Sequence, residues 1–196
     1  SFFTHDNLFD IRFLALFYLL LWIPAVYLVM RAALERVSYF TEGAVLAVLG
    51  TLMFSDIAYI TYFNSLYSDG LILICLLYVT GGAMLLHREE NHDSLFVLVV
   101  TVAGLALIFA EKRCFLAGIV IAVFLFAQIR IFQKMQIRVL SMLCVTVLLA
   151  GTITAVYNSA DEFDETSKFH AMTRGVLLQS ADPEQTLAQL NIDHSY

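Results

Sequence analysis

The chain has 196 residues, of which 60% are hydrophobic and only 14% are charged. Soluble domains carry about 25% charged residues, so this chain lacks the polar side chains that a water-exposed surface requires. With two prolines and nine glycines among so many apolar residues, a disordered or low-complexity protein is excluded. We therefore expect an integral membrane protein.

The formal net charge of −6 is concentrated near the end of the chain. From residue 161 onward, seven acidic residues accompany two basic ones, which leaves ten acids against nine bases in the rest. No basic stripe is present to meet phosphates, so no nucleic-acid partner is expected. The three scattered cysteines indicate neither a disulfide framework nor a zinc site.

Six apolar runs approach the roughly 20 residues that a spanning helix needs. They cover residues 11–31, 43–63, 70–87, 94–111, 114–132 and 139–157. Their length excludes barrel strands and predicts an all-α, polytopic transmembrane bundle of about six helices. Residues 1–10 would be an outer-face tail, 11–157 the membrane domain and 158–196 an extracytoplasmic helical segment. Since the first residue is Ser1 and not Met, we expect this sequence to be part of a longer chain.

Basic residues in short loops set the orientation of a membrane protein. Alternate loops of the predicted bundle carry six of them: Arg31, Arg36, Arg88, Arg130, Lys134 and Arg138. We expect this side to face the cytoplasm and both ends of the chain to face outward.

The second run contains an acidic residue, Asp56, which is costly in a membrane helix and usually functional. On a continuous helix Asp56, Tyr59 and either Tyr62 or Phe63 share one face. Asn64, just beyond, adds an amide of the kind that binds a polyhydroxylated ligand. Aromatic residues are also common at membrane interfaces, which accounts for Tyr62 but not for Asp56.

Lys112 and Arg113 lie between the fourth and fifth runs, which almost no loop separates. One interpretation is a charged cap that extends to the lipid headgroups. The other is a site for a lipid phosphate, where Arg offers two parallel hydrogen bonds and Lys a point charge. Both remain open at this point.

Three further patterns give local predictions. Gly81-Gly82 indicates close helix packing. Asp182-Pro183 is typical of a helix start, so helices are expected over 168–178 and 183–190. His5, Asp6 and Asp10 leave a divalent metal ion open, although no zinc or nucleotide motif is present.

The stretch from Asp56 to Tyr67 (Asp-Ile-Ala-Tyr-Ile-Thr-Tyr-Phe-Asn-Ser-Leu-Tyr) resembles a motif of the WsfD-like glycan biosynthesis hexose transferases. These are bacterial polytopic proteins related to the GT-C class of glycosyltransferases. Glu111-Lys112-Arg113 falls where that family has a short outer-face loop with Lys, and the tail is similar to its extracytoplasmic segment. The resemblance extends from about residue 45 to the end. Among its departures, Asp69-Gly70 stands where the family often has an acid followed by Pro.

The resemblance implies transfer of a hexose from a polyprenyl-phosphate donor to a cell-envelope glycan, outside the bacterial cytoplasmic membrane. Asp56 would be catalytic, taking the acceptor's proton or orienting the acceptor. The substrate-binding residues would be Tyr59, Tyr62, Asn64, Lys112 and Arg113. The partners would be the lipid-linked donor, the glycan acceptor and membrane lipids, with no cofactor expected. The alternative is a transporter or flippase-like subunit, or a non-catalytic membrane scaffold.

Overall fold

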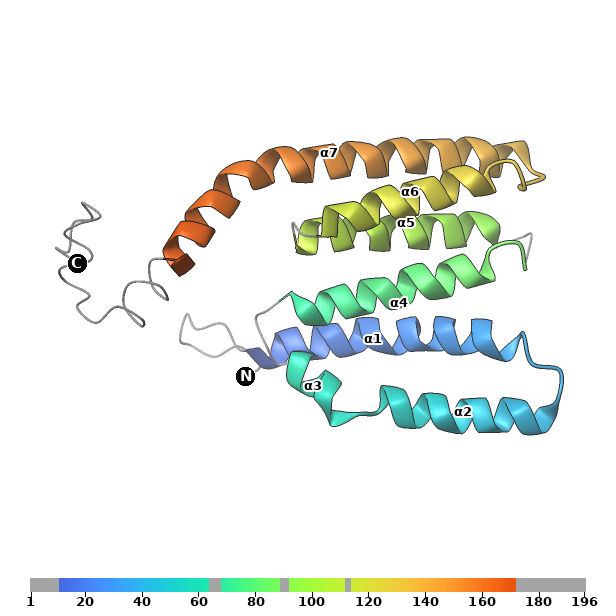
Figure 1. The fold of residues 1–196 in the computed structure, drawn as a ribbon. Helices are drawn as coiled ribbons and strands as arrows, with labels where there is room; N and C mark the ends of the chain where they lie inside the picture. The colour runs from blue at the N-terminus through green and yellow to red at the C-terminus, as the bar shows by residue number, and fades with distance from the viewer. Residues whose placement is uncertain (1–10, 64–67, 89–91, 112–113, 172–196) are drawn as a thin grey trace, which may run out of the picture. The chain divides into compact units, whose positions relative to one another are not determined.

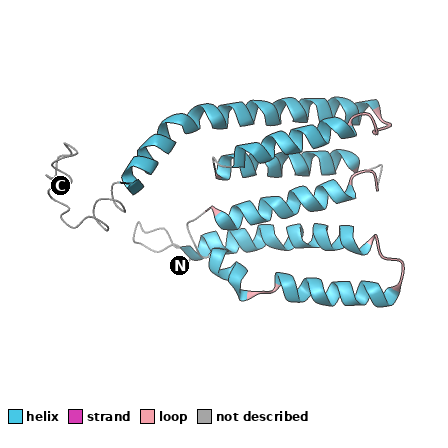
Figure 2. Cartoon of the chain, viewed as in Figure 1, coloured by secondary structure: helices cyan, strands magenta, loops and turns pink. Residues whose placement is uncertain are grey.

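The structure is a computed structural model, in which every described element is a helix (Figure 1, Figure 2). It describes residues 11–63, 68–88, 92–111 and 114–171, with the backbone alone at 11, 60 and 158–171. The helices are α1 (Ile11–Leu34), α2 (Phe40–Phe54), α3 (Ile57–Phe63), α4 (Asp69–Leu85), α5 (Asp93–Ala110), α6 (Phe115–Gln128) and α7 (Met135–Ala171). The predicted all-α class is confirmed.

The second apolar run is not one helix, contrary to the prediction. It forms α2 and the short α3, and the interruption lies at Ser55 and Asp56. The Asp56 carboxylate accepts a hydrogen bond from the Ala58 amide at 2.9 Å. Asp and Ser side chains bond to nearby backbone groups in this way, which favours the start of a new helix over continuation of the old one.

Helix α4 lies between α1 and α5, and it contacts both along much of its length (Figure 1). The expected close packing at Gly81-Gly82 is confirmed. A Cβ atom on Gly81 would lie 3.0 Å from Leu28 Cβ and 3.1 Å from the Val29 nitrogen of α1, whereas one on Gly82 would lie 2.8 Å from Val100 Cγ2 of α5. The two glycines thus bring the neighbouring helices close on opposite sides of α4.

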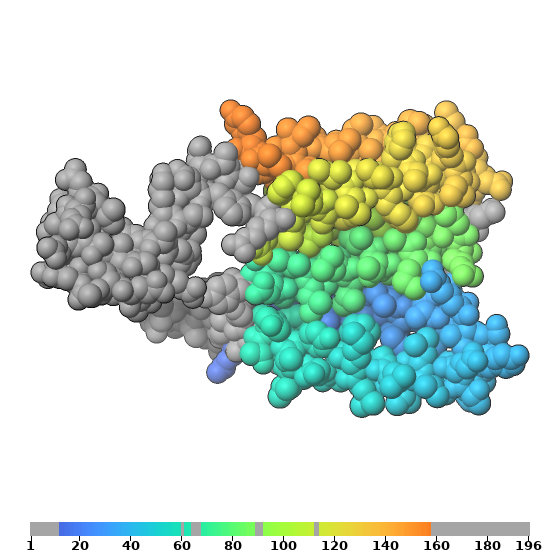
Figure 3. Space-filling model, viewed as in Figure 1, coloured from blue at the N-terminus to red at the C-terminus, as the bar shows by residue number. Residues whose placement is uncertain are grey.

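Two apolar cores result. The larger one joins α4, α5, α6 and the first part of α7, and it contains Leu85, Val100, Leu125 and Leu148, all fully buried. The smaller one surrounds Trp22 of α1 and includes residues of α3 and α4. Helix α2 contributes little to either core, and it forms one edge of the described surface beside a hollow (Figure 3).

Within the described ranges, four helical segments are long and apolar enough to cross a membrane: Arg12–Leu34, Phe40–Tyr59, Asp93–Ala110 and Met135–Tyr157. Helices α4 and α6 are apolar but shorter. Together these six segments correspond to the six predicted runs. The buried hydroxyl groups of Thr101 and Thr152 bond within their own helix to carbonyl oxygens four residues earlier, at 2.7 and 2.8 Å, whereas the buried Ser141 hydroxyl has no hydrogen-bond partner among the described residues. Such bonds satisfy polar groups where no water is available.

The chain divides into two compact units, residues 1–155 and 156–196. Helix α7 begins in the first unit and continues through residues 158–171, so the helix expected from 168 begins as the last turn of α7. No Gly or Pro interrupts that stretch. The remainder of the predicted tail helices lies outside the described residues.

The three connections after α1, α4 and α6 lie at one end of the first unit (Figure 1). The six basic residues that set the predicted orientation all lie in or beside these connections, so we call this the basic end. The start of α1, helix α3, the start of α4 and the turn between α5 and α6 lie at the other end, which we call the opposite end.

We expect Gly81→Val to destabilise the fold by about 1–3 kcal/mol, because its side chain would meet the α1 backbone and not a movable side chain. Gly43→Val is the matched control, since a Cβ there would meet only Leu34 Cδ2 at 3.8 Å. Thermal unfolding in detergent measures both. A Gly81→Val variant as stable as the Gly43→Val variant would contradict this account of the α1–α4 contact.

Candidate functional site

A groove of about 420 Å³ lies between α1, α2 and α3. Its lining combines apolar, aromatic and polar side chains: Leu19, Trp22, Ile23, Val26, Thr51, Phe54, Ser55, Asp56, Tyr59 and Phe63. All of them belong to the first unit. A concave site that is mainly apolar, with a few polar groups gathered on one side, is the usual form of a small-molecule site.

Aromatic rings form the main wall of this groove. Trp22 of α1 is only 6% exposed, and its ring centroid lies 4.7 Å from that of Tyr59, 5.2 Å from Phe63 and 5.8 Å from Phe54. The contacts with Phe54 and Phe63 are edge-to-face, an arrangement in which the positive edge of one ring meets the negative face of another. This cluster holds α2 and α3 against α1 on either side of the helix interruption.

The carboxylate of Asp56 lies at the interruption itself and is exposed. The Ser55 amide bonds to the Thr51 carbonyl at 3.0 Å and closes α2, while the Tyr59 amide bonds to the Asp56 carbonyl at 3.1 Å and opens α3. The Ala58 amide occupies one carboxylate oxygen. A carboxylate has two oxygens that can each accept hydrogen bonds, so Asp56 has acceptor capacity beyond its role in the backbone.

Asp56 lies beyond the middle of the bundle, toward the opposite end. Helix α2 has 15 residues, which at the usual rise per residue span roughly 22 Å from the basic end. In a hydrocarbon layer of about 30 Å this places Asp56 toward the opposite end, where water and lipid headgroups begin. An ionised carboxylate costs much less there than at the membrane centre.

The structure brings Asp56 and Tyr59 together in the groove, as the sequence predicts, although not on one continuous helix face. Of the two alternatives for the third position, Phe63 lines the groove, while Tyr62 is 51% exposed and does not line it. Asn64, Lys112 and Arg113 lie outside the described residues.

The turn that carries Lys112 and Arg113 is short, as predicted. Helix α5 ends at Ala110 and α6 begins at Phe115, with the Cys114 amide bonded to the Glu111 carbonyl at 2.9 Å. Burial raises the pKa of the Cys114 thiol and the Glu111 carboxylate raises it further, so this cysteine is protonated and a poor nucleophile at neutral pH. Glu111 and Cys114 do not line the groove, although the turn lies at the same end as α3 (Figure 1).

Trp22 is the groove residue that sequence reasoning missed. The sequence gives a weak indication that Trp22 is important, because it is the only tryptophan of the chain and follows Tyr18 at helical spacing. Both residues are buried in the smaller core.

No group of three His, Cys, Asp or Glu side chains that could hold a metal ion is present within the part of the chain that the structure describes. The predicted metal-ligand candidates near the N-terminus lie outside that part.

The long apolar helices and the basic end together define a multi-pass α-helical membrane protein. The model of the YfdI N-terminal transmembrane domain family matches residues 1–196, and the chain belongs to this family. No curated protein and no solved structure matches the chain. The family description names a membrane domain and no activity.

We expect Trp22→Ala to destabilise the first unit by about 3–5 kcal/mol, because three rings lose their common partner. Tyr27→Ala on the same helix is the control, because Tyr27 is 62% exposed. Thermal unfolding in detergent compares the two variants. Equal unfolding temperatures would show that the aromatic cluster does not hold α3 in place.

Proposed function

We propose that this membrane domain serves a glycosyltransferase that moves a hexose from a polyprenyl-phosphate donor to a cell-envelope glycan at the outer face of the membrane. The observation that carries the proposal is the groove in which an accessible carboxylate lies beside a wall of aromatic rings. The resemblance of Asp56–Tyr67 to the WsfD-like hexose transferases points in the same direction.

The groove has the chemistry that sugar binding requires. A hexose has apolar C–H faces, which pack on aromatic rings, and hydroxyl groups around its edge, which need hydrogen-bond partners. Tyr59 offers a partly exposed ring that the buried Trp22 supports, whereas Asp56, Ser55 and Thr51 offer oxygen atoms. Asn64 would follow directly after α3 and add an amide.

The proposed reaction needs a proton acceptor. The acceptor hydroxyl attacks the anomeric carbon of the donor, and it loses its proton as the bond from carbon to the phosphate oxygen breaks. Asp56 is suited to take that proton, because its second oxygen is not needed to start α3. Its position toward the opposite end agrees with a reaction at the membrane surface.

The departing lipid phosphate needs positive charge to stabilise it. Helix α5 ends at the opposite end, the same end as α3, and Lys112 and Arg113 follow α5 in the sequence. We propose that they bind this phosphate, which requires the donor to reach across the start of α4, since α4 lies between α1 and α5.

A transporter is the second candidate, and the helix interruption at Ser55 and Asp56 favours it. Secondary transporters bind substrates at interrupted helices near the membrane centre, usually in two repeated halves. Among the described helices, however, α1, α4, α5 and α7 continue without a comparable break, and the interruption lies away from the centre. The transferase therefore remains the better-supported function.

We expect Asp56→Asn to lower hexose transfer at least 100-fold, the usual contribution of a general base. Asn retains an oxygen that can accept the Ala58 amide bond, so α3 should still form. The assay uses membranes containing the full-length protein, the acceptor glycan of the same cells, and radiolabelled polyprenyl-phosphate glucose, mannose or galactose.

Glu42→Gln is the matched control, because Glu42 is an exposed carboxylate at the basic end of α2.

A double Lys112→Gln, Arg113→Gln variant should raise the donor concentration needed for half-maximal rate at least tenfold. No transfer by the unmodified protein from any of the three donors, or full transfer by Asp56→Asn, would contradict the proposal.

The proposed outer-face activity requires the basic end to face the cytoplasm. In a chain whose three cysteines are replaced by serine, we expect a membrane-impermeant maleimide to label Asp69→Cys on intact cells and to spare Tyr39→Cys. Both residues are exposed, at the opposite and basic ends respectively. After the cells are opened, both should react. The reverse pattern on intact cells would overturn the orientation.

A further inference from the structure

A second polar cluster lies at the basic end, around the connection between α4 and α5. His87 has a φ of 66°, a left-handed value that residues other than glycine rarely adopt. Its amide donates to the Asp93 carboxylate at 2.9 Å, its Nε2 lies 2.8 Å from Gln128 Oε1, and its ring lies 4.6 Å from that of Phe132. Contacts to three other segments therefore hold a strained backbone, which occurs mainly at functional sites.

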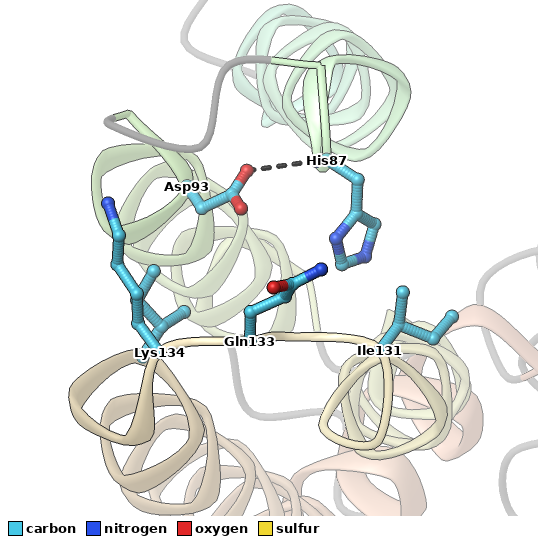
Figure 4. A pocket seen from close by; sticks show the side chains of 6 residues that line it. His87, Asp93, Ile131, Gln133 and Lys134 are labelled. Carbon is cyan, nitrogen blue, oxygen red and sulfur yellow. Dashed lines mark hydrogen bonds between the residues drawn. The ribbon is translucent and has the colours of Figure 1, made fainter.

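A pocket of about 150 Å³ opens beside this histidine (Figure 4). Its lining combines one carboxylate, one ammonium, an imidazole, an amide and two aliphatic side chains: His87, Asp93, Ile131, Gln133, Lys134 and Ile137. The side chain of Gln133 points into the space between Asp93 and the His87 ring, and Lys134 extends from the start of α7 toward α5. The small volume suits a headgroup and not a sugar ring with its lipid carrier.

Asp93 is the residue that determines what this pocket can bind. It is only 4% exposed, and the amide of His87 occupies one of its oxygens. A nearly buried carboxylate is stable when it meets a cation or several donors. Because Asp93 lines the pocket, it favours a ligand that brings positive charge.

The surroundings favour a ligand that also carries negative charge. Lys134 lines the pocket and brings an ammonium group to it. Basic pockets between membrane helices bind lipid phosphates. Ile131, which is 59% exposed, supplies an apolar rim that a lipid acyl chain can contact.

We propose that this pocket binds the phosphoethanolamine headgroup of a membrane phospholipid. The ammonium group donates hydrogen bonds to the Asp93 carboxylate and the Gln133 carbonyl, while the phosphate meets the Lys134 ammonium. Two carbons separate the two charges of the headgroup, so a small pocket holds both. A phospholipid that lacks the ammonium would leave Asp93 facing a second negative charge.

The test is lipid binding by the full-length protein purified in detergent and offered equal amounts of phosphatidylethanolamine and phosphatidylglycerol, with bound lipids counted by native mass spectrometry. We expect phosphatidylethanolamine to be preferred. Asp93→Asn retains an acceptor for the His87 amide but loses the charge. It should weaken phosphatidylethanolamine binding about tenfold and should strengthen phosphatidylglycerol binding, because the repulsion between two negative charges is removed. Lys134→Gln should weaken both lipids.

Glu35→Gln is the control, because Glu35 is an acid at the same end that pairs with Arg31 at 3.0 Å, away from the pocket. A second measurement needs no variant: phosphatidylcholine, whose methylated nitrogen cannot donate hydrogen bonds, should bind the unmodified protein more weakly than phosphatidylethanolamine. Equal binding of all three lipids by the unmodified protein, or phosphatidylethanolamine binding unchanged in Asp93→Asn, would overturn the proposal.

Discussion

The close approach of three helices at Gly81 and Gly82 is the constraint on which the rest of the first unit depends. Lipid tails are as apolar as the helices themselves, so the hydrophobic effect does not drive membrane helices together. These helices associate where small residues allow dense contact. One glycine admits α1 and the other admits α5, which makes α4 the common neighbour of both. Helices α2 and α3 then attach through α1, and α6 through α5.

The groove follows from a weaker arrangement on the outer side of α1. Helix α2 contacts α1 where Met30 lies over Gly50 and where the Phe54 ring meets Trp22. Beyond Phe54 the chain turns at Ser55 and Asp56. The interruption lets α3 fold back onto Trp22 through Tyr59 and Phe63. A continuous helix would have carried these side chains past the ring. The same Asp56 that accepts the Ala58 amide bond therefore creates the space that it lines.

Much of this fold could be predicted from the sequence. The length of each apolar run predicts a spanning helix, and the pair of adjacent glycines predicts a close contact between helices. The interruption could not be predicted, since a single Asp56 in an apolar run is compatible with both a continuous helix and a new helix start. The pairing of Trp22 with Tyr59 and of His87 with Gln128 joins residues about 40 positions apart. Such contacts depend on which helices become neighbours, and local patterns do not specify that.

The two ends of the first unit are held together by different kinds of contact. At the basic end, His87 ties the connection after α4 to α5, to α6 and to Phe132, and the Arg138 guanidinium donates to the Phe132 carbonyl at 2.6 Å. At the opposite end, α3 is seven residues long and is held mainly by aromatic contacts. The contacts that hold α3 are therefore ring contacts with α1, whereas polar groups join the connections at the basic end. Asp56 lies beside these rings with an exposed carboxylate, so the groove combines an apolar wall with an accessible acid.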